Sequence, residues 1–211
     1  RKADPLQFVR LEEFAIKKQA AKGSAYHRWQ EQVYQIHRDP ALVAHYTFEQ
    51  DARHPDRLTN QAPATGDQLD GILEGRQSKP QWAPGRWARK TALFFDRSQD
   101  QRVRVPSDPT FCVTGPITLG AWIKMEEAPD GFVPGMHGGN IISNAKTLTY
   151  NYHLAYGLYY DSHMMIYMRA REIDFHTIGP KIDLSLDEWH FLSVTHDNSS
   201  VRFYIDGKLM K

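Results

Sequence analysis

Two acidic side chains late in the sequence alternate along a predicted strand. Glu172 and Asp174 are separated by one residue, so a β-strand would direct both carboxylates to the same face. Retaining glycoside hydrolysis uses two carboxyl groups about 5–5.5 Å apart, of which one is the nucleophile and the other the acid/base. The sequence has His176 or Thr177 where the second glutamate would stand. Because the proton donor is missing, we predict no catalytic residue and interpret the acidic pair as a chance near-match.

The same acidic residues suggest metal binding as a second chemistry. Carboxylates with an imidazole can bind a divalent cation, and loop oxygen atoms are common ligands of Ca²⁺. The weak candidates for metal ligands are Asp96, Asn140, Asp161, Glu172 and Asp174. None has a diagnostic spacing, and the alternative is an ordinary solvent-facing strand, so Ca²⁺ is a candidate cofactor and no other is expected. The ten histidines and the single cysteine show no zinc-binding pattern.

Aromatic residues suggest a third chemistry, the stacking of sugar rings. The candidate ligand-binding residues are Trp82, Trp87, Tyr152, Tyr156 and Tyr167. The two tryptophans fall in a segment with proline and glycine, which we expect to be a loop, and their alternative role is to cover a sheet edge. Tyr152 and Tyr156 share one face of the predicted strand 150–160, and the alternative there is a buried core face.

Other catalytic signatures are missing from the sequence. It contains no G-x-S-x-G nucleophile elbow, no P-loop and no dinucleotide-binding glycine pattern. Cys112 lies between Phe111 and Val113 and is predicted to be a small buried hydrophobic residue. His190 and His196 are predicted to be polar edges of a sheet.

The elements that would position these residues are β-strands. The stretch 189–209 predicts a hairpin, because two apolar runs flank the polar tip 197–200. Asp206-Gly207 then predicts a second tight turn, where glycine supplies a positive φ. Further strands are predicted at 102–106, 117–125, 140–144, 150–160 and 164–170.

These strands occur in an order that resembles a known family. The pattern W-H-(apolar)…(apolar)-D-G within 189–209 is similar to that of the laminin-G-like, concanavalin A-like jelly roll of bacterial extracytoplasmic proteins. Upstream pieces that resemble other strands of this family lie at 42–49, 70–75, 92–96 and 117–124. The resemblance implies a two-sheet antiparallel β-sandwich over about residues 40–211. That scaffold hosts lectins, adhesion modules and a few hydrolases, so its function signal is weak.

Residues 1–38 predict a helical arm. Asp4-Pro5 favours a helix start, Gly23-Ser24 favours a break with a new N-cap, and Asp39-Pro40 favours an end. The arm carries an apolar stripe formed by Tyr26, Trp29, Val33 and Ile36. We expect this stripe to pack on the sandwich or on a partner. The run 28–49 also resembles the junction in bacterial FecR-like, anti-sigma-factor-type proteins that carry a laminin-G-like domain behind a membrane anchor.

The composition is that of an ordinary globular protein. The 211 residues are 41% hydrophobic and 24% charged. The 26 Lys and Arg residues nearly balance the 25 Asp and Glu residues. Because the chain has no large positive charge, we do not expect nucleic acid as a partner. The chain begins with arginine, so we expect a fragment with an anchor upstream. We also expect its last strands to be missing, and a further segment or a partner to cover the open edge.

We therefore predict a mainly β protein, with a helical arm at 1–38 and a jelly-roll domain at 39–211. The predicted function is non-catalytic recognition of a glycan or protein in the bacterial envelope, as the periplasmic or surface ectodomain of a FecR-like regulator. One alternative is a structural module that oligomerises through its arm. A glycoside hydrolase is disfavoured by the missing acid.

Overall fold

The structure is a computed structural model that describes residues 24–113, 115–126, 139–146, 149–156, 163–170, 173–181 and 184–210. Between 139 and 181 it describes the side chains of residues 140–144, 154, 177–179 and 181. The chain divides into two compact units, Arg1–Pro106 and Ser107–Lys211. Both contain antiparallel sheets, and a helix lies near the N-terminus, so the predicted fold class is confirmed. The predicted jelly-roll range of 39–211 stays a prediction, and the division falls within it.

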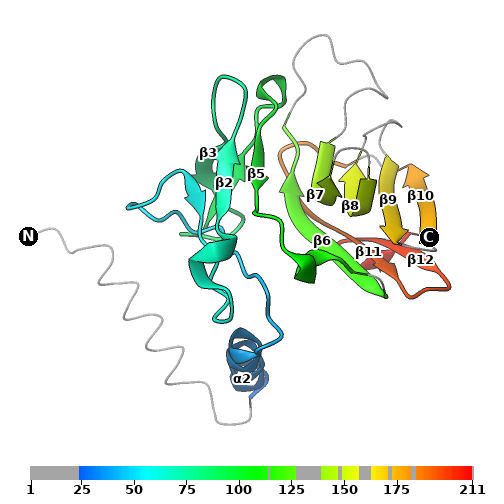
Figure 1. Ribbon diagram of the computed structural model, residues 1–211, viewed down its shortest axis with the longest axis horizontal. Coiled ribbons are helices and arrows are strands. Elements are labelled where there is room, and N and C mark those ends of the chain that lie inside the picture. Colours follow the sequence, from blue (N-terminus) through cyan, green and yellow to red (C-terminus); the bar gives the residue numbers. More distant parts are fainter. Residues whose placement is uncertain are drawn as a thin grey trace, which may run out of the picture. The chain divides into compact units, whose positions relative to one another are not determined.

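The second unit contains two four-stranded antiparallel sheets. The first has the order β13 (Lys208–Leu209), β12 (Val201–Ile205), β11 (Trp189–His196), β6 (Ile117–Lys124). The other has the order β10 (Ile173–Lys181), β9 (His163–Ala170), β8 (Thr149–Tyr156), β7 (Gly139–Lys146). Figure 1 shows them as two layers, and the short helix η3 (Pro109–Phe111) precedes the first strand.

The core of this unit lies between the two sheets. Leu119, Val194 and Phe203 stand side by side on β6, β11 and β12 and are buried. Leu154 of β8 joins them from the other sheet and is fully buried. Gly179 of β10 lies against the Phe203 ring, where a Cβ atom would come within 3.0 Å of the ring. The predicted alternation of apolar and polar residues is therefore confirmed in β6, and the two layers form a sandwich.

The hairpin of β11 and β12 is confirmed, including both of its turns. At the first turn, Asp197 accepts hydrogen bonds from the backbone N–H groups of Ser199 and Ser200 at 3.1 and 2.8 Å. The hydroxyl of Ser199 and the Arg202 guanidinium also contact this carboxylate and, with those N–H groups, lower its pKa well below the usual range. At the second turn, Asp206 and Gly207 have φ values of 49° and 79°, as a tight turn of this kind requires.

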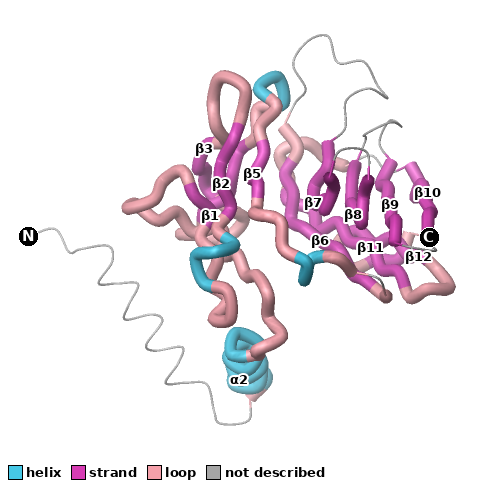
Figure 2. The backbone as a smooth tube through the Cα atoms, in the orientation of Figure 1, coloured by secondary structure: helices cyan, strands magenta, loops and turns pink. Residues whose placement is uncertain are grey.

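The first unit contains two smaller antiparallel sheets (Figure 2). One has the order β1 (Arg57–Leu58), β2 (Gly71–Glu74), β5 (Arg102–Arg104), and the other pairs β3 (Gln81–Pro84) with β4 (Thr91–Phe94). The 3-10 helices are η1 (Gly66–Leu69) and η2 (Arg97–Gln99). Its buried apolar residues are Leu58, Ala62, Leu69 and Leu73. Strand alternation places Leu58 and Leu73 on the inner face and leaves Arg57, Ile72 and Glu74 on the outer face.

Two predictions of local structure in this unit are wrong. Residues 42–49 do not form a strand, because His45 donates its N–H to the Asn60 side chain at 2.8 Å and Phe48 has a φ of 55°. Such a φ interrupts a ladder of backbone hydrogen bonds. Trp82 lies on strand β3 rather than in a loop, because Pro84 and Gly85 come at the end of that strand and not within it.

Two predictions of burial in the second unit are also wrong. Cys112 is exposed, because it follows η3 as the C-cap residue instead of continuing an apolar strand. His196 is only 7% exposed, because its place on β11 is on the same face as Leu192 and Val194. A polar residue at an alternating position follows its strand into the core.

Helix α2 (Ala25–Arg38) begins and ends where the sequence predicts. Ser24 is its N-cap and accepts the His27 N–H at 3.1 Å, and Asp39 is its C-cap. The helix start predicted at Asp4-Pro5 lies outside the described residues. None of the residues of α2 is buried, and Trp29 and Ile36 are 56% and 57% exposed.

The end of α2 contacts the following segment through two imidazole rings. The His37 and His45 rings are 4.5 Å apart between centroids. Burial, followed by the charge of His37, lowers the pKa of His45 from its ordinary value of 6.5. Arg38, which lies over the Tyr34 ring, and Asp39, which binds the Ala41 N–H, are the charged groups next to His37 in the chain.

We expect acid to weaken this contact between α2 and the rest of the first unit. The lowered pKa of His45 means that this residue binds a proton more readily when the two rings are separated than when they are in contact. The contact should therefore be intact above about pH 6.5 and weaken as the pH falls below it. Spin labels at Gln32→Cys and Gln68→Cys, in a Cys112→Ser background, should give a narrow distance distribution at pH 8 and a broader one at pH 5. His45→Gln removes the titrating ring and should remove the broadening. Identical distributions at pH 8 and pH 5 in the chain that keeps His45 would contradict the prediction.

Candidate functional site

The two predicted tryptophans have different surroundings. Trp82 donates its indole N–H to the Pro55 carbonyl at 2.8 Å, and its role as a cover over a sheet edge stays a prediction. Trp87 lies in the turn between β3 and β4 and is 55% exposed. The Arg86 guanidinium carbon stands 4.8 Å from the centre of the Trp87 ring system. The structure thus leaves Trp87, and not Trp82, as an exposed aromatic surface.

The three predicted tyrosines lie on the second sheet of the sandwich. Tyr152 and Tyr156 are on β8 and Tyr167 is on β9, but their side chains lie outside the described residues. Leu154, between the first two, is fully buried, as the core-face alternative predicts for this strand. The role of the tyrosines in binding stays a prediction.

The predicted metal ligands are not brought together in the part of the structure that is described. Asp161 and Glu172 lie outside it, and so does the side chain of Asp174 on β10. Asn140 is an exposed residue of β7. Asp96 accepts the Ser98 N–H at 2.9 Å and so closes a turn of its own. Among the described residues, no three His, Cys, Asp or Glu side chains lie close enough to hold a metal ion.

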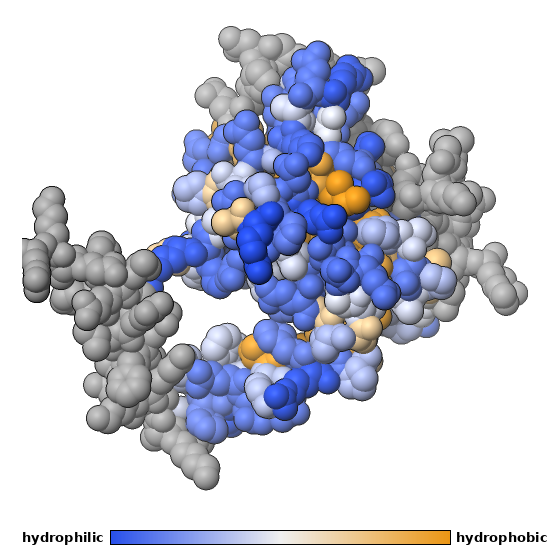
Figure 3. Space-filling model, turned by 60° about the vertical axis from the view of Figure 1, so that its left-hand side comes forward, coloured by the Kyte–Doolittle hydropathy of each residue, from blue (hydrophilic) through white to orange (hydrophobic). Residues whose placement is uncertain are grey.

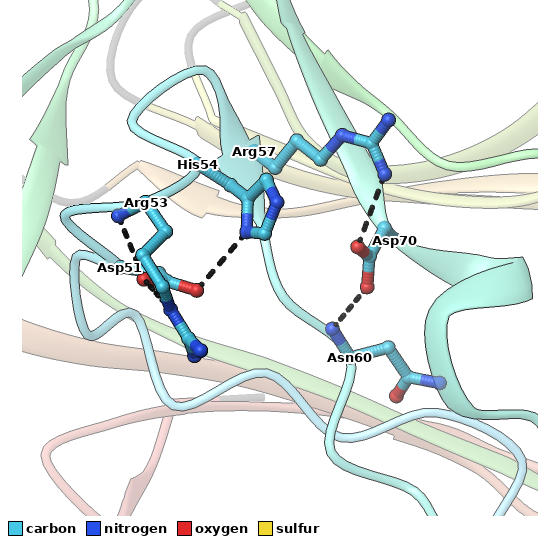
Figure 4. Close-up of polar contacts among 6 residues, drawn as sticks. All are labelled: Asp51, Arg53, His54, Arg57, Asn60 and Asp70. Atoms are coloured by element: carbon cyan, nitrogen blue, oxygen red, sulfur yellow. Dashed lines mark hydrogen bonds and ion pairs between the residues drawn. The ribbon is translucent and has the colours of Figure 1, made fainter.

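Two acidic residues of the first unit have specific partners (Figure 4). Asp51 accepts the Arg53 N–H at 2.9 Å and contacts His54 Nδ1 at 3.2 Å. These hydrogen bonds lower the pKa of Asp51 to about 2, and the largest contribution comes from the Arg53 backbone N–H. Asp70 accepts the Asn60 N–H at 2.8 Å and lies 3.6 Å from Arg57 Nη1.

Asn60 links this network to the segment after α2. Its side-chain oxygen accepts the His45 N–H, and its amide group donates to Thr65 Oγ1 and to the Gly66 carbonyl at 2.8 Å each. Tyr46 donates its hydroxyl to the Leu69 carbonyl, and burial, followed by the charge of Asp70, raises its pKa to about 12. Because the polar groups of Asn60 are engaged within the protein, the network anchors the chain rather than binding a ligand.

A third acidic residue of this unit lies beside a hollow. Glu74 on β2 accepts Arg102 Nε at 3.0 Å on one oxygen and Arg104 Nε at 2.6 Å on the other. Arg104, with Arg102 in support, lowers the pKa of Glu74 below its usual value. A hollow of about 600 Å³ opens here, lined by Ile72, Leu73, Glu74, Gly75, Arg76, Lys79, Asp100 and Arg102. Its volume falls in the range of small-molecule sites.

A smaller hollow lies at the tip of the β11–β12 hairpin. It has a volume of about 340 Å³ and is lined by Thr177, His196, Asn198, Ser199, Ser200, Val201 and Phe203. On the outer face of the same sheet, the Trp122 and Phe191 rings lie against each other at an interplanar angle of 44°, with centroids 5.3 Å apart. Gly120 makes room for this pair, because a Cβ atom there would come within 2.9 Å of the Phe191 ring.

A serine, a histidine and an aspartate are connected by hydrogen bonds at the start of β11. Ser185 Oγ lies 2.9 Å from His190 Nε2, and His190 Nδ1 lies 2.9 Å from Asp206 Oδ2. This order of atoms is that of a nucleophile, base and orienting acid. Ser185, however, donates its hydroxyl to Glu188 at 2.7 Å, and the other Asp206 oxygen holds the Phe191 N–H at 2.8 Å. We therefore interpret the group as a clamp that joins the turn after β12 to β11.

The sequence match agrees with this sandwich. Residues 97–211 match the laminin G family that is described as the Concanavalin A-like lectin/glucanases superfamily. The chain belongs to this family, as its strand motifs predicted. No curated protein and no solved structure matches the chain. Within the residues that the structure describes, no helix has the length and apolar character needed to cross a membrane.

We expect the clamp to stabilise the fold without supporting hydrolysis. Asp206→Ala removes the acceptor for the Phe191 N–H and for His190 and should lower the free energy of unfolding by about 1–3 kcal/mol. Asp187→Ala is a matched control, because Asp187 also has a positive φ, of 59°, and is exposed. Both variants share the backbone strain, so equal midpoints in urea unfolding would contradict the role of the clamp.

Proposed function

We propose that the chain is a non-catalytic recognition domain that binds a glycan, or a protein that carries one. Family membership supports a binding module, and the sequence lacks the second glutamate that a retaining mechanism needs at 176 or 177. The observation that carries the proposal is the exposed indole of Trp87. A large, rigid aromatic group that remains more than half exposed is suited to the apolar face of a sugar ring.

The β3–β4 turn holds Trp87 in position. Gly85 donates its N–H to the Lys90 carbonyl at 2.8 Å, and Lys90 donates its N–H to the Trp87 carbonyl at 3.0 Å. Gly85 itself lies so close to the backbone that a Cβ atom would come within 2.8 Å of the Thr91 carbonyl oxygen. The tip is therefore ordered by its own backbone, which reduces the entropy that binding would cost.

The proposed setting is the bacterial envelope. The resemblance of residues 28–49 to FecR-like proteins supports an extracytoplasmic ectodomain of an anchored regulator. In that setting, a recognition domain would report the presence of an external glycan. The resemblance at residues 28–49 lies outside the family match, which begins at residue 97, so the assignment to the envelope depends on the resemblance alone.

We expect Trp87→Ala to reduce binding to a glycan selected on an array by about tenfold or more, because central aromatic contacts often contribute most of the binding energy. Trp87→Phe should retain part of the affinity. Trp82→Phe is the matched control, since it loses only the hydrogen bond to Pro55. Isothermal titration of the three variants tests the proposal, and unchanged affinity of the Trp87→Ala variant would contradict it.

A specific observation favours assembly through α2 as a second candidate function. Tyr26, Trp29, Val33 and Ile36 are spaced by three, four and three residues, which is the seam of a two-stranded coiled coil. The residues that would flank such a seam are Gln30, Gln32 and His37. Since none of them carries a fixed charge, two copies of α2 would meet without repulsion between like charges. The proposed occupant of the seam is α2 of a second copy.

We expect the Trp29→Ala, Ile36→Ala double variant to shift the chain from dimer towards monomer in sedimentation velocity. Alanine favours the helix, so a loss of assembly would not reflect a loss of helical structure. Gln35→Ala, on the opposite side of α2, is the control and should have no effect. A chain that sediments as a monomer at all concentrations would contradict this function.

A further inference from the structure

The outer face of the β1–β2–β5 sheet carries three arginines and two carboxylates. Arg102 and Arg104 bind Glu74, and Arg57 lies 3.6 Å from Asp70. Arg57 and Arg104 lie on either side of Ile72 in the strand register, and Arg102 lies opposite Glu74. The other charged residues at the hollow form ion pairs, Arg76 with Asp100 at 3.3 Å and Lys79 with Asp56 at 2.7 Å. The sheet face itself therefore has an excess of positive charge.

Glu74 binds the same atom, Nε, of both arginines. Both guanidinium groups bind Glu74 through Nε, and no described residue is hydrogen-bonded to the Nη atoms of Arg102 or Arg104. Glu74 is 25% exposed, whereas Arg102 and Arg104 are 65% and 51% exposed. The carboxylate thus stands behind two guanidinium groups and fixes their orientation, while their outer nitrogen atoms remain accessible.

Folding alone gives little reason for this arrangement. Exposed ion pairs contribute little to stability, so two of them do little to hold β2 against β5. Orientation matters far more to a ligand, because a planar guanidinium fork binds a carboxylate through two parallel hydrogen bonds. A fork that is already oriented also loses less entropy on binding.

The surroundings of the arginines suit a sugar ring. Ile72, between Arg57 and Arg104, is 37% exposed and offers a small apolar surface. The hollow of about 600 Å³ beside it combines this surface with charged and backbone groups. The face in view in Figure 3 is mainly hydrophilic, with apolar patches that are small and separate. The hollow itself is lined by the charged residues Glu74, Arg76, Lys79, Asp100 and Arg102. This lining favours a polar, charged ligand over a hydrophobic one.

We propose that Glu74, Arg102, Arg104 and the adjacent hollow form a binding site for an acidic sugar, with the two arginines holding its carboxylate and Ile72 contacting its ring. This inference rests on the proposed glycan recognition and specifies one class of ligand for it. Glu74 and Ile72 precede the matched range of residues 97–211, and Arg102 and Arg104 lie within it. The sequence alone did not assign this sheet to binding.

The test compares two probes that differ in charge only at the carboxylate. Isothermal titration with tetragalacturonate and with its methyl ester should show binding of the free acid that is at least tenfold tighter. Arg102→Gln and Arg104→Gln should each weaken binding of the free acid about tenfold or more, because each removes a charge-assisted hydrogen-bond donor. Arg102→Lys keeps the charge, loses the fork and should also weaken binding. Arg53→Gln is the control, since Arg53 is 85% exposed and pairs with Asp51 instead.

Glu74→Gln separates an oriented site from a merely basic surface. It removes a negative charge, so a surface that acts through net charge would bind the free acid more tightly. The oriented site should bind it several-fold more weakly. Tighter binding by Glu74→Gln, or equal affinity for acid and ester, would overturn the inference. Amide shifts of Ile72 and Arg102 on addition of galacturonate give a second readout in the unmodified chain, and unchanged shifts would likewise overturn it.

The outcomes also separate this inference from the proposed function. Binding of neutral glycans that depends on Trp87, with no effect of Arg102 or Arg104, would overturn only the acidic-sugar site. Binding of the free acid that depends on Arg102 and not on Trp87 would support the site and remove the role of Trp87.

Discussion

The burial of alternate residues along β11 is the constraint on which the sandwich depends. This strand pairs with β6 on one side and β12 on the other. Leu192, Val194 and His196 each meet a buried or half-buried partner across both ladders. A shift of one residue would turn Leu192 and Val194 to the outside. The register is fixed at both ends, since Asp197 closes one turn and Asp206 ties the other to the Phe191 N–H. Apolar burial and turn chemistry therefore specify the same alignment.

Several carboxylates of the described residues have a common role. Asp197, Asp206 and Asp70 each accept a backbone N–H group, and in each case the hydrogen bond fixes a turn or joins two segments. Carboxylates used in this way are acceptors held in one orientation, and they are poorly suited to exchange protons with a substrate. Glu74 differs, because its partners are side chains and not backbone groups. Glu74 fixes the orientation of the two arginines, whose side chains are exposed.

The sequence predicted the local elements well, because their signals are local. Ser24 as a helix cap, the Asp206-Gly207 turn and the alternation in 117–124 each depend on residues within a few positions. The prediction of a strand at 42–49 was wrong, because the contact of His45 with Asn60 and the positive φ of Phe48 do not follow from apolar alternation. The Glu74 cluster was missed for a similar reason, since its members are 28 and 30 residues apart and meet only through the register of β2 and β5.

Ser185, His190 and Asp206 have the arrangement of a catalytic group without its chemistry. The Trp-His and Asp-Gly motifs bring His190 and Asp206 together because the hairpin register requires it, and the resulting hydrogen bond adds to the tie between the turn and β11. A nucleophile would need its hydroxyl free to transfer its proton to the histidine as it attacks. Ser185 instead donates to Glu188, so the neighbouring carboxylate competes with the imidazole for the same proton. Distances between pairs of atoms are thus insufficient evidence for catalysis. The role of Ser185 depends on which neighbour accepts its single hydroxyl proton, and here that neighbour is Glu188.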